Sequence, residues 1–287
     1  MSIAAFPAAD PEAARPAGAV ADAGRRALAF HPTRFEYPPE MNVIWHRTRP
    51  EFACAANGVS LLMPYVEPYV VRSIRAVASN LDGALHDETL AYLRQEGQHH
   101  AQHRRFNDLV VDRFGLLSIS ERWMSGVFER LTNVHNRRFG VAFAAGFEAV
   151  AFAAARWTAD HASELFEDAD PVPSGLFQWH LAEEVEHKCV AIDVYRAIGG
   201  GRVMYAAAMT LSAVLLALFA WINTMVMLVA TRRVVHPMAH LNLVRWTVSF
   251  LFELLPTMVM SVSERHHPSQ LADPLFYDLW LQENRAR

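Results

Sequence analysis

The sequence predicts an all-α protein in which an antiparallel four-helix bundle is followed by a long apolar helical extension. No run of residues alternates between apolar and polar side chains strongly enough, between turn signals, to indicate a sheet. Four segments instead show helical periodicity and helix-end signals, and short links join them. Residues 203–230 contain no charged side chain at all. We therefore expect the bundle to end near residue 200 and the apolar extension to follow it.

The composition narrows the class of protein. The 287 residues are 52% hydrophobic and 20% charged, which is typical of a globular protein. A formal net charge of -4 gives no reason to expect a nucleic-acid partner. The two cysteines, Cys54 and Cys189, are too few for a disulfide framework or a cysteine-based zinc site. Histidine, the commonest metal ligand, occurs 14 times and clusters in residues 99–103 and 180–187.

The segment before the first helix is expected to lack regular structure. Residues 1–30 are rich in Ala and Pro with scattered charges of both signs, which predicts a disordered tail. They lack the basic start and unbroken apolar run of a secretory signal. Several prolines give residues 31–58 the character of irregular entry structure. We assign residues 31–200 to the metal-binding bundle.

The first two bundle helices are predicted from proline and glycine positions. The first spans residues 64–79, where Pro64 suits the first helical position. The second spans residues 83–114 and stops at Gly115.

The third and fourth helices follow from capping and glycine signals. The sequence "SISE" at residues 118–121 is a capping-box pattern and predicts the start of a third helical region. This region extends to about residue 161, with a break expected at 133–136. The fourth helix spans residues 176–198 and ends at three consecutive glycines.

The C-terminal third carries the apolar extension. At ~1.5 Å rise per residue, residues 203–230 could cross a bilayer core of ~30 Å. We expect residues 201–265 to form a membrane-associated helical hairpin on the cytoplasmic face, followed by a C-terminal tail over 266–287. The alternative is a fifth helix that packs against the bundle.

Two Glu-x-x-His pairs are the strongest functional signal. Residues three or four positions apart share a helix face, so Glu96 and His99 can grip one ion, and Glu184 and His187 can do the same. Di-iron carboxylate bundles combine two such pairs with one glutamate from each of two further helices. Glu67 and Glu148 are the candidates for these single ligands, because each lies alone in an apolar helical segment. The chain order is then Glu, Glu-x-x-His, Glu, Glu-x-x-His.

The nature of the ligands favours particular metals. Four carboxylates and two imidazoles without a thiolate suit iron or manganese better than structural zinc. We expect two iron ions, with manganese or zinc as alternatives.

Other polar residues near the two motifs have less certain roles. His180 lies four residues before Glu184 on the same face and is expected to be a seventh ligand; the alternative is a hydrogen bond to a ligand carboxylate. His103, Glu183 and Asp193 are expected to support the ligands from outside. Glu183 could also replace Glu184 as the partner of His187. Glu186 is expected to be a surface charge or an ion-pair partner.

The segments "RQEGQHHAQHRRFN", "WHLAEEVEHKCVAIDVY" and "SLLMPYVEPYVVRSIR" resemble a bacterial family known as predicted metal-dependent hydrolases, over about residues 30–270. The ligand set is similar to that of ferritin-like di-iron oxygenases. The spacing His180-x-x-x-Glu184-x-x-His187 also resembles di-iron arylamine N-oxygenases such as p-aminobenzoate N-oxygenase. This second resemblance implies that His180 is an iron ligand. The apolar C-terminal segment departs from those soluble enzymes.

The leading hypothesis for function is a di-iron enzyme that activates dioxygen and oxidises an apolar small molecule or lipid. Such a reaction also requires an electron donor. The alternative is a hydrolase in which two metal ions activate a water molecule. An iron store and a membrane desaturase fit the sequence less well, and a homodimer is left open.

Overall fold

The structure is a computed structural model, and it describes residues 28, 30, 32–134, 136–263, 265–274 and 276–277. Within these residues every regular element is a helix, apart from an isolated β-bridge between His46 and Ala169. The predicted all-α class is therefore confirmed. The expected disordered tail at 1–30 lies almost entirely outside the described residues, as do the last residues of the chain.

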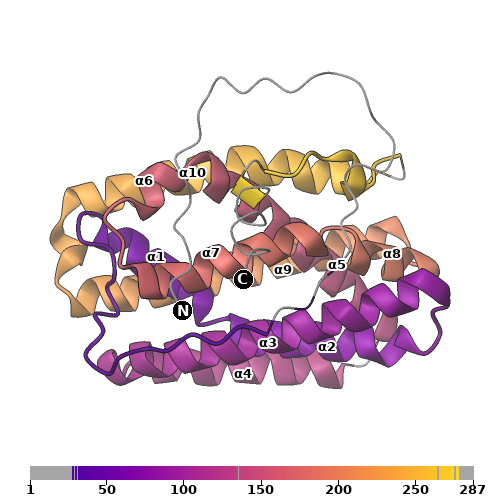
Figure 1. The fold of residues 1–287 in the computed structure, drawn as a ribbon, viewed down its shortest axis with the longest axis horizontal. Coiled ribbons are helices and arrows are strands. Elements are labelled where there is room, and N and C mark those ends of the chain that lie inside the picture. Colours follow the sequence, from indigo (N-terminus) through magenta and orange to yellow (C-terminus); the bar gives the residue numbers. More distant parts are fainter. Residues whose placement is uncertain are drawn as a thin grey trace.

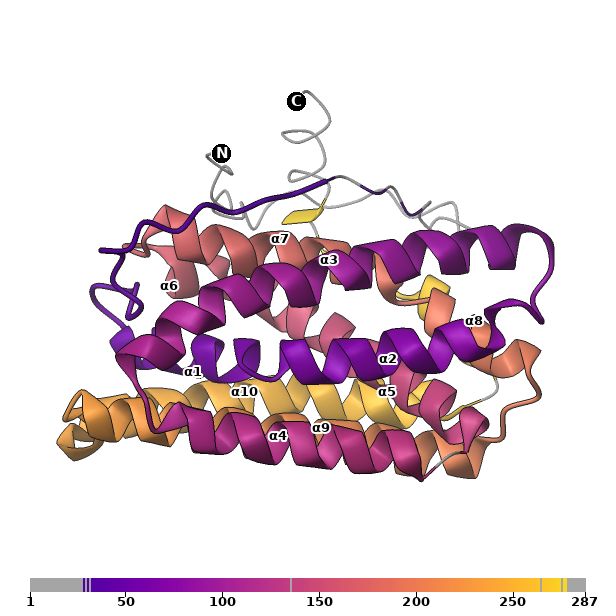
Figure 2. The same cartoon turned by 90° about the horizontal axis from the view of Figure 1, so that it is seen from below.

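Most of the helices run along the long axis of the molecule (Figure 1), and Figure 2 shows layers in which α2 and α5 lie in the middle. Helices α3 and α7 lie on one side of this middle layer, and α9 and α10 lie on the other side. The bundle elements are α1 (Pro50–Ser60), α2 (Met63–Ala78), α3 (Gly83–Arg113), α4 (Leu117–Asn133), α5 (Arg137–Asp160), α6 (Ala162–Phe166), α7 (Pro171–His187) and α8 (Val190–Ala197). The later elements are α9 (Arg202–Ala230), η1 (Arg233–Val235), α10 (Pro237–Ser261) and η2 (Pro268–Gln270).

Two expectations about the first half of the chain were wrong. Helix α1 lies inside the segment expected to be irregular, because Pro50 occupies the first helical position, where proline is tolerated. Helix α4 begins at Leu117 without a side-chain cap, because the Ser118 hydroxyl donates to the carbonyl oxygen of Gly115. The expected break at 133–136 is present, and Asn136 caps α5 by accepting a hydrogen bond from the backbone N–H of Phe139.

The fourth predicted helix is divided into α7 and α8 at residues 188 and 189. Buried Lys188 at this break donates to the carbonyl oxygen of Leu271 (2.9 Å) and to the carboxylate of Asp273 (2.5 Å). The described part of the expected C-terminal tail therefore packs against the bundle. Gly199 ends α8 with a φ of 74°, a left-handed conformation that favours glycine.

Helix α9 is attached to the bundle by close backbone approaches. A Cβ atom on Gly146 of α5 would lie 2.5 Å from the Cα of Met209, and one on Gly58 of α1 would lie 2.6 Å from the carbonyl oxygen of Ala220. In the part of the chain that the structure describes, three helices are long and apolar enough to cross a membrane: α5, α9 and α10. The apolar window of α5 is 72% buried, against 28% for α9 and 17% for α10. Helix α5 therefore belongs to the protein core, whereas fewer than a third of the residues in the apolar windows of α9 and α10 are buried.

Candidate metal centre

Four helices bring the six principal candidate ligands into the core of the bundle. Helix α2 carries Glu67 and α5 carries Glu148, whereas α3 and α7 each carry one Glu-x-x-His pair. The exposed fraction of each of the six residues is 1% or less. Charged residues are rarely buried this completely unless they are paired or bind a metal.

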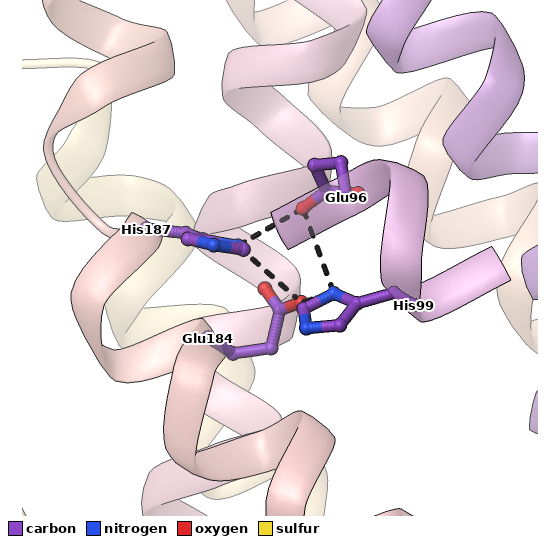
Figure 3. Close-up of side chains that lie close together, drawn as sticks. All are labelled: Glu96, His99, Glu184 and His187. Carbon is purple, nitrogen blue, oxygen red and sulfur yellow. Dashed lines mark ion pairs between the residues drawn. The ribbon is translucent and has the colours of Figure 1, made fainter. Parts of the chain in front are cut away.

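The two Glu-x-x-His pairs face each other across the site (Figure 3). Nδ1 of His187 lies 2.9 Å from Oε1 of Glu96 and 3.6 Å from Oε1 of Glu184. Nδ1 of His99 lies 3.5 Å from Oε1 of Glu184 and 3.9 Å from Oε1 of Glu96. Each of these two carboxylates therefore lies between the two imidazoles, where it could bridge two ions.

The remaining candidates lie at opposite ends of this group. Nε2 of His180 is 3.6 Å from Oε1 of Glu67 and 2.8 Å from Oε1 of Glu184. At the other end, Oε2 of Glu148 is 3.8 Å from Nδ1 of His187. The structure thus brings together all seven residues predicted as ligands. Two groups, one of Glu96, His99, Glu184 and His187 and one of Glu67, His103 and His180, have atoms close enough to hold a metal ion.

Eight atoms that face the centre make no hydrogen bond among the described residues, although Nδ1 of His187 lies at ion-pair distance from Oε1 of Glu96. They are both carboxylate oxygens of Glu67 and of Glu96, Oε2 of Glu148 and of Glu184, and Nδ1 of His99 and of His187. Buried polar atoms normally have partners, and a buried charge without one costs several kcal/mol. Hard oxygen donors and imidazole nitrogens converging without hydrogen bonds fit divalent cations of the iron or manganese kind.

Outer hydrogen bonds aim both histidines of the Glu-x-x-His pairs at the centre. Nε2 of His99 donates to Oε2 of Glu183 (2.8 Å), and Nε2 of His187 donates to Oε1 of Gln95 (3.0 Å). The Gln95 amide orientation is set because its nitrogen donates to Oε2 of Glu186 (2.9 Å). With the proton on Nε2, each Nδ1 presents a lone pair inward, which is the arrangement of metal-bound histidines.

The prediction that Glu186 is a surface charge was wrong. Its side chain is buried, and besides Gln95 it accepts a hydrogen bond from the Tyr277 hydroxyl (2.6 Å). Helix periodicity could not show this, because Tyr277 lies far along the chain and approaches only when the C-terminal segment packs on α7.

A second hydrogen-bond chain runs from Asn107 to His180. Asn107 donates through its amide nitrogen to the backbone of Ser60 (2.8 Å), so its Oδ1 accepts from the Ser60 hydroxyl (2.6 Å). The hydroxyl in turn accepts from Nδ1 of His103 (2.7 Å), whose Nε2 therefore accepts from Nδ1 of His180 (2.6 Å). Nε2 of His180 makes a hydrogen bond with Oε1 of Glu184 (2.8 Å). His103 thus reaches the ligands through His180, and its role as a support stays a prediction.

Electrostatics at the centre also favour a bound cation. Burial raises the pKa of Glu67 and of Glu148 well above the usual range, and neighbouring carboxylates raise both further. Burial opposes the ionisation of Glu184 too, but the adjacent His187 and His180 hold its pKa well below the usual range. A divalent cation would favour the charged form of each carboxyl and so oppose the effect of burial.

Tyr92 is a site residue that sequence reasoning missed. Its hydroxyl donates to Oε1 of Glu148 (2.5 Å), and burial together with the Glu148 charge raises its pKa well above the usual value. Tyr92 therefore stays neutral and remains a donor. Its position four residues before Glu96, on the same helix face, is the signal that could have identified it.

Asp193 lies apart from the other predicted support residues. It is on α8, beyond the break that follows His187, and it accepts a hydrogen bond from Nε2 of His267 (2.9 Å). This pair ties the C-terminal segment to α8.

The fold and the site define an all-helical protein with a buried cluster of carboxylates and imidazoles suited to binding metal. The family model described as "Predicted metal-dependent hydrolase" matches residues 30–272, and the chain belongs to this family. The family resemblance predicted from the sequence is therefore confirmed. No curated protein and no solved structure gives a significant match.

Proposed function

We propose that the buried cluster binds two divalent metal ions and that this dinuclear centre is the active site of a metal-dependent enzyme. The observation that carries the proposal is the convergence of unpartnered donor atoms from α2, α3, α5 and α7. These four helices correspond to a ferritin-like four-helix bundle, in which two helices each supply a Glu-x-x-His pair and two each supply a single glutamate. His180 is the seventh ligand in this proposal.

Hydrolysis is the reaction that we put first, because the family is described as one of metal-dependent hydrolases. Two bound metal ions would lower the pKa of a water molecule and polarise the substrate. The residues of the chain would hold these ions and keep bulk water away. His180 is 9% exposed and is the least buried member of the donor set. A substrate would therefore approach from the His180 end.

The second candidate is oxidation of an apolar substrate by dioxygen at two iron ions, with an external electron donor. The observation that favours it is the ligand set itself. Four carboxylates with imidazoles and no thiolate are the donors of di-iron carboxylate proteins. The same residues serve both reactions, so the identity of the metal and the need for oxygen distinguish them.

The test uses full-length protein that has been stripped by a chelator and reloaded separately with Fe(II), Mn(II) or Zn(II). Hydrolysis is measured on p-nitrophenyl esters of increasing acyl length without oxygen, and oxidation is measured as oxygen uptake in the presence of a reductant. Turnover of esters with zinc or manganese supports the hydrolase. Oxygen uptake with iron alone supports the oxidase, and failure of folded protein to bind any of the three metals overturns the proposal.

The exposed surface of α9 and α10 is proposed to lie on an anionic lipid bilayer, which places the metal centre beside a source of apolar substrate. From Arg202 to Phe252, both included, the sequence contains four arginines and no acidic residue. Arg232 and Arg233 follow α9 directly, at the point where basic residues would meet lipid headgroups. Because α9 is docked along the bundle, we propose contact along its length, with residues 201–265 as the membrane-binding unit.

A further inference from the structure

We propose that the two metal positions are unequal and that the ion next to His99 is bound first and more tightly than the ion next to His187. The inference rests on the proposed dinuclear centre and concerns how this chain divides its donors between the two ions. It makes Glu183 and Gln95 positioning residues that act through the histidines.

The supports of the two histidines are arranged reciprocally. In α3 the residue before the ligand Glu96 is Gln95, and it accepts from His187 of α7. In α7 the residue before the ligand Glu184 is Glu183, and it accepts from His99 of α3. The same helix position thus supports the histidine of the opposite helix in both halves. The two halves differ in chemistry, because one support is a carboxylate and the other is a neutral amide.

A carboxylate support strengthens an imidazole ligand more than an amide does. Accepting the Nε2 proton increases the basicity of the inward Nδ1, and a nearby negative charge also attracts a cation. Both oxygens of Glu183 are engaged by N–H donors, from His99 (2.8 Å) and from the indole of Trp179 (2.9 Å). Two N–H donors on its oxygens stabilise the ionised form of the carboxylate.

At the His187 position the supporting carboxylate does not contact the histidine directly. Gln95 stands between His187 and Glu186, so the Glu186 charge reaches the histidine only through an amide. Glu148 is the single glutamate at that end, and one of its oxygens already accepts a hydrogen bond from Tyr92. Both features weaken the donors at the His187 position.

His180 adds to the difference between the two metal positions. The ring centroids of His180 and His99 are 4.2 Å apart, whereas those of His99 and His187 are 5.4 Å apart. His180 also faces Glu67. The first position is therefore lined by two imidazoles and Glu67, and the second by one imidazole and Glu148. Glu96 and Glu184 lie between them.

The test is a stepwise titration of metal-free, full-length protein with Co(II), whose visible absorbance reports its ligands. The wild type is expected to bind two ions in two resolved steps. Glu183→Gln keeps the shape of the side chain and should weaken the first step by about 10- to 100-fold, the range measured for outer partners of metal ligands. Glu129→Gln, on the exposed face of α4, is the control for loss of a carboxylate. Helicity and melting temperature show whether each variant is folded.

A second variant tests the opposite half without changing the net charge. Gln95→Glu combined with Glu186→Gln moves the carboxylate one position inward and retains the number of hydrogen-bonding groups. This double variant should tighten the second step and bring the two steps together. Two equal steps in the wild type, or a first step that Glu183→Gln leaves unchanged, would overturn the inference while the dinuclear centre stands. Wild-type protein that binds no Co(II) would remove the centre itself.

Discussion

The bundle core buries charged side chains, whereas the surface of α9 and α10 exposes apolar ones. The core buries four carboxylates around one point, with unpartnered oxygens that face one another. Across the molecule, α9 and α10 expose large apolar side chains, among them Trp221 at 62% and Phe252 at 79%. Each arrangement is costly in water on its own. The comparison shows two regions whose exposed or buried groups lack a complement within the described residues, and we propose that cations complete the first and lipid covers the second.

Removing a bridging carboxylate should have the largest effect on the bundle. Glu184→Ala should reduce the metal content from about two ions per chain to nearly none, since Glu184 lies beside both imidazoles. Glu148→Ala should remove the ion at the His187 position and leave the protein helical. Elemental analysis and circular dichroism measure both results. Two ions retained in Glu184→Ala would exclude this residue as a ligand.

Charging the exposed apolar surface should have the next largest effect. Phe252→Asp should weaken binding to phosphatidylglycerol-containing vesicles by about tenfold or more, because burying a large apolar side chain contributes about 1.5–3 kcal/mol. Flotation of full-length protein with these vesicles measures the loss. Leu90→Asp, on α3 across the molecule, is the matched control and should bind like the wild type. If Phe252→Asp instead splits a dimer and leaves lipid binding intact, a second copy covers this surface.

The boundary between the two regions can be tested at Gly146. Gly146→Ala places a methyl group against the backbone of α9 and should destabilise the fold by about 1–3 kcal/mol, the usual cost of overpacking. Gly126→Ala, on α4, has open space around the new methyl and should be neutral or slightly stabilising. Thermal unfolding of the two variants gives the comparison. Equal melting temperatures would mean that α9 is only loosely attached.

The smallest expected effect on stability concerns the hydrogen bonds that join α6 to α10. Burial raises the pKa of Glu164, but hydrogen bonds from Arg245 and Trp246 outweigh burial and leave the pKa below its usual value. A lowered folded-state pKa stabilises the fold above the unfolded-state pKa, and this contribution is lost as the pH falls through the folded-state pKa.

Glu164→Gln should therefore lower stability by about 1 kcal/mol or less near neutral pH. The difference from wild type should vanish in acid. Urea unfolding at several pH values measures it, and a difference that grows in acid would contradict this explanation.

Helix faces were predictable from the sequence, whereas contacts between distant helices were not. The spacing of Glu96 and His99 placed both on one face of α3, and the isolation of Glu148 in an apolar segment indicated its inward position. The two residues that support the ligand histidines could be predicted only in part. Glu183 was expected to support a ligand, but Gln95 looks like an ordinary helical glutamine until α7 is packed beside it.

The errors have similar physical causes. Glu186 was expected to be a surface charge or an ion-pair partner, and its partner Tyr277 comes from the end of the described chain. The break between α7 and α8 at residue 188 could not be predicted, because no proline or glycine lies there. Lys188 instead reaches Asp273 there, a contact that only tertiary packing provides.

The metal content of wild-type protein, purified in detergent from iron-replete cells, is the first quantity to determine. We expect about two metal ions per chain, iron if the centre is an oxidase and zinc or manganese if it is a hydrolase. Removal of these ions with a chelator should lower the melting temperature, because metal binding stabilises the folded state. Folded protein without bound metal, and without a shift in melting temperature when iron, manganese or zinc is added, would contradict a metal centre in this bundle.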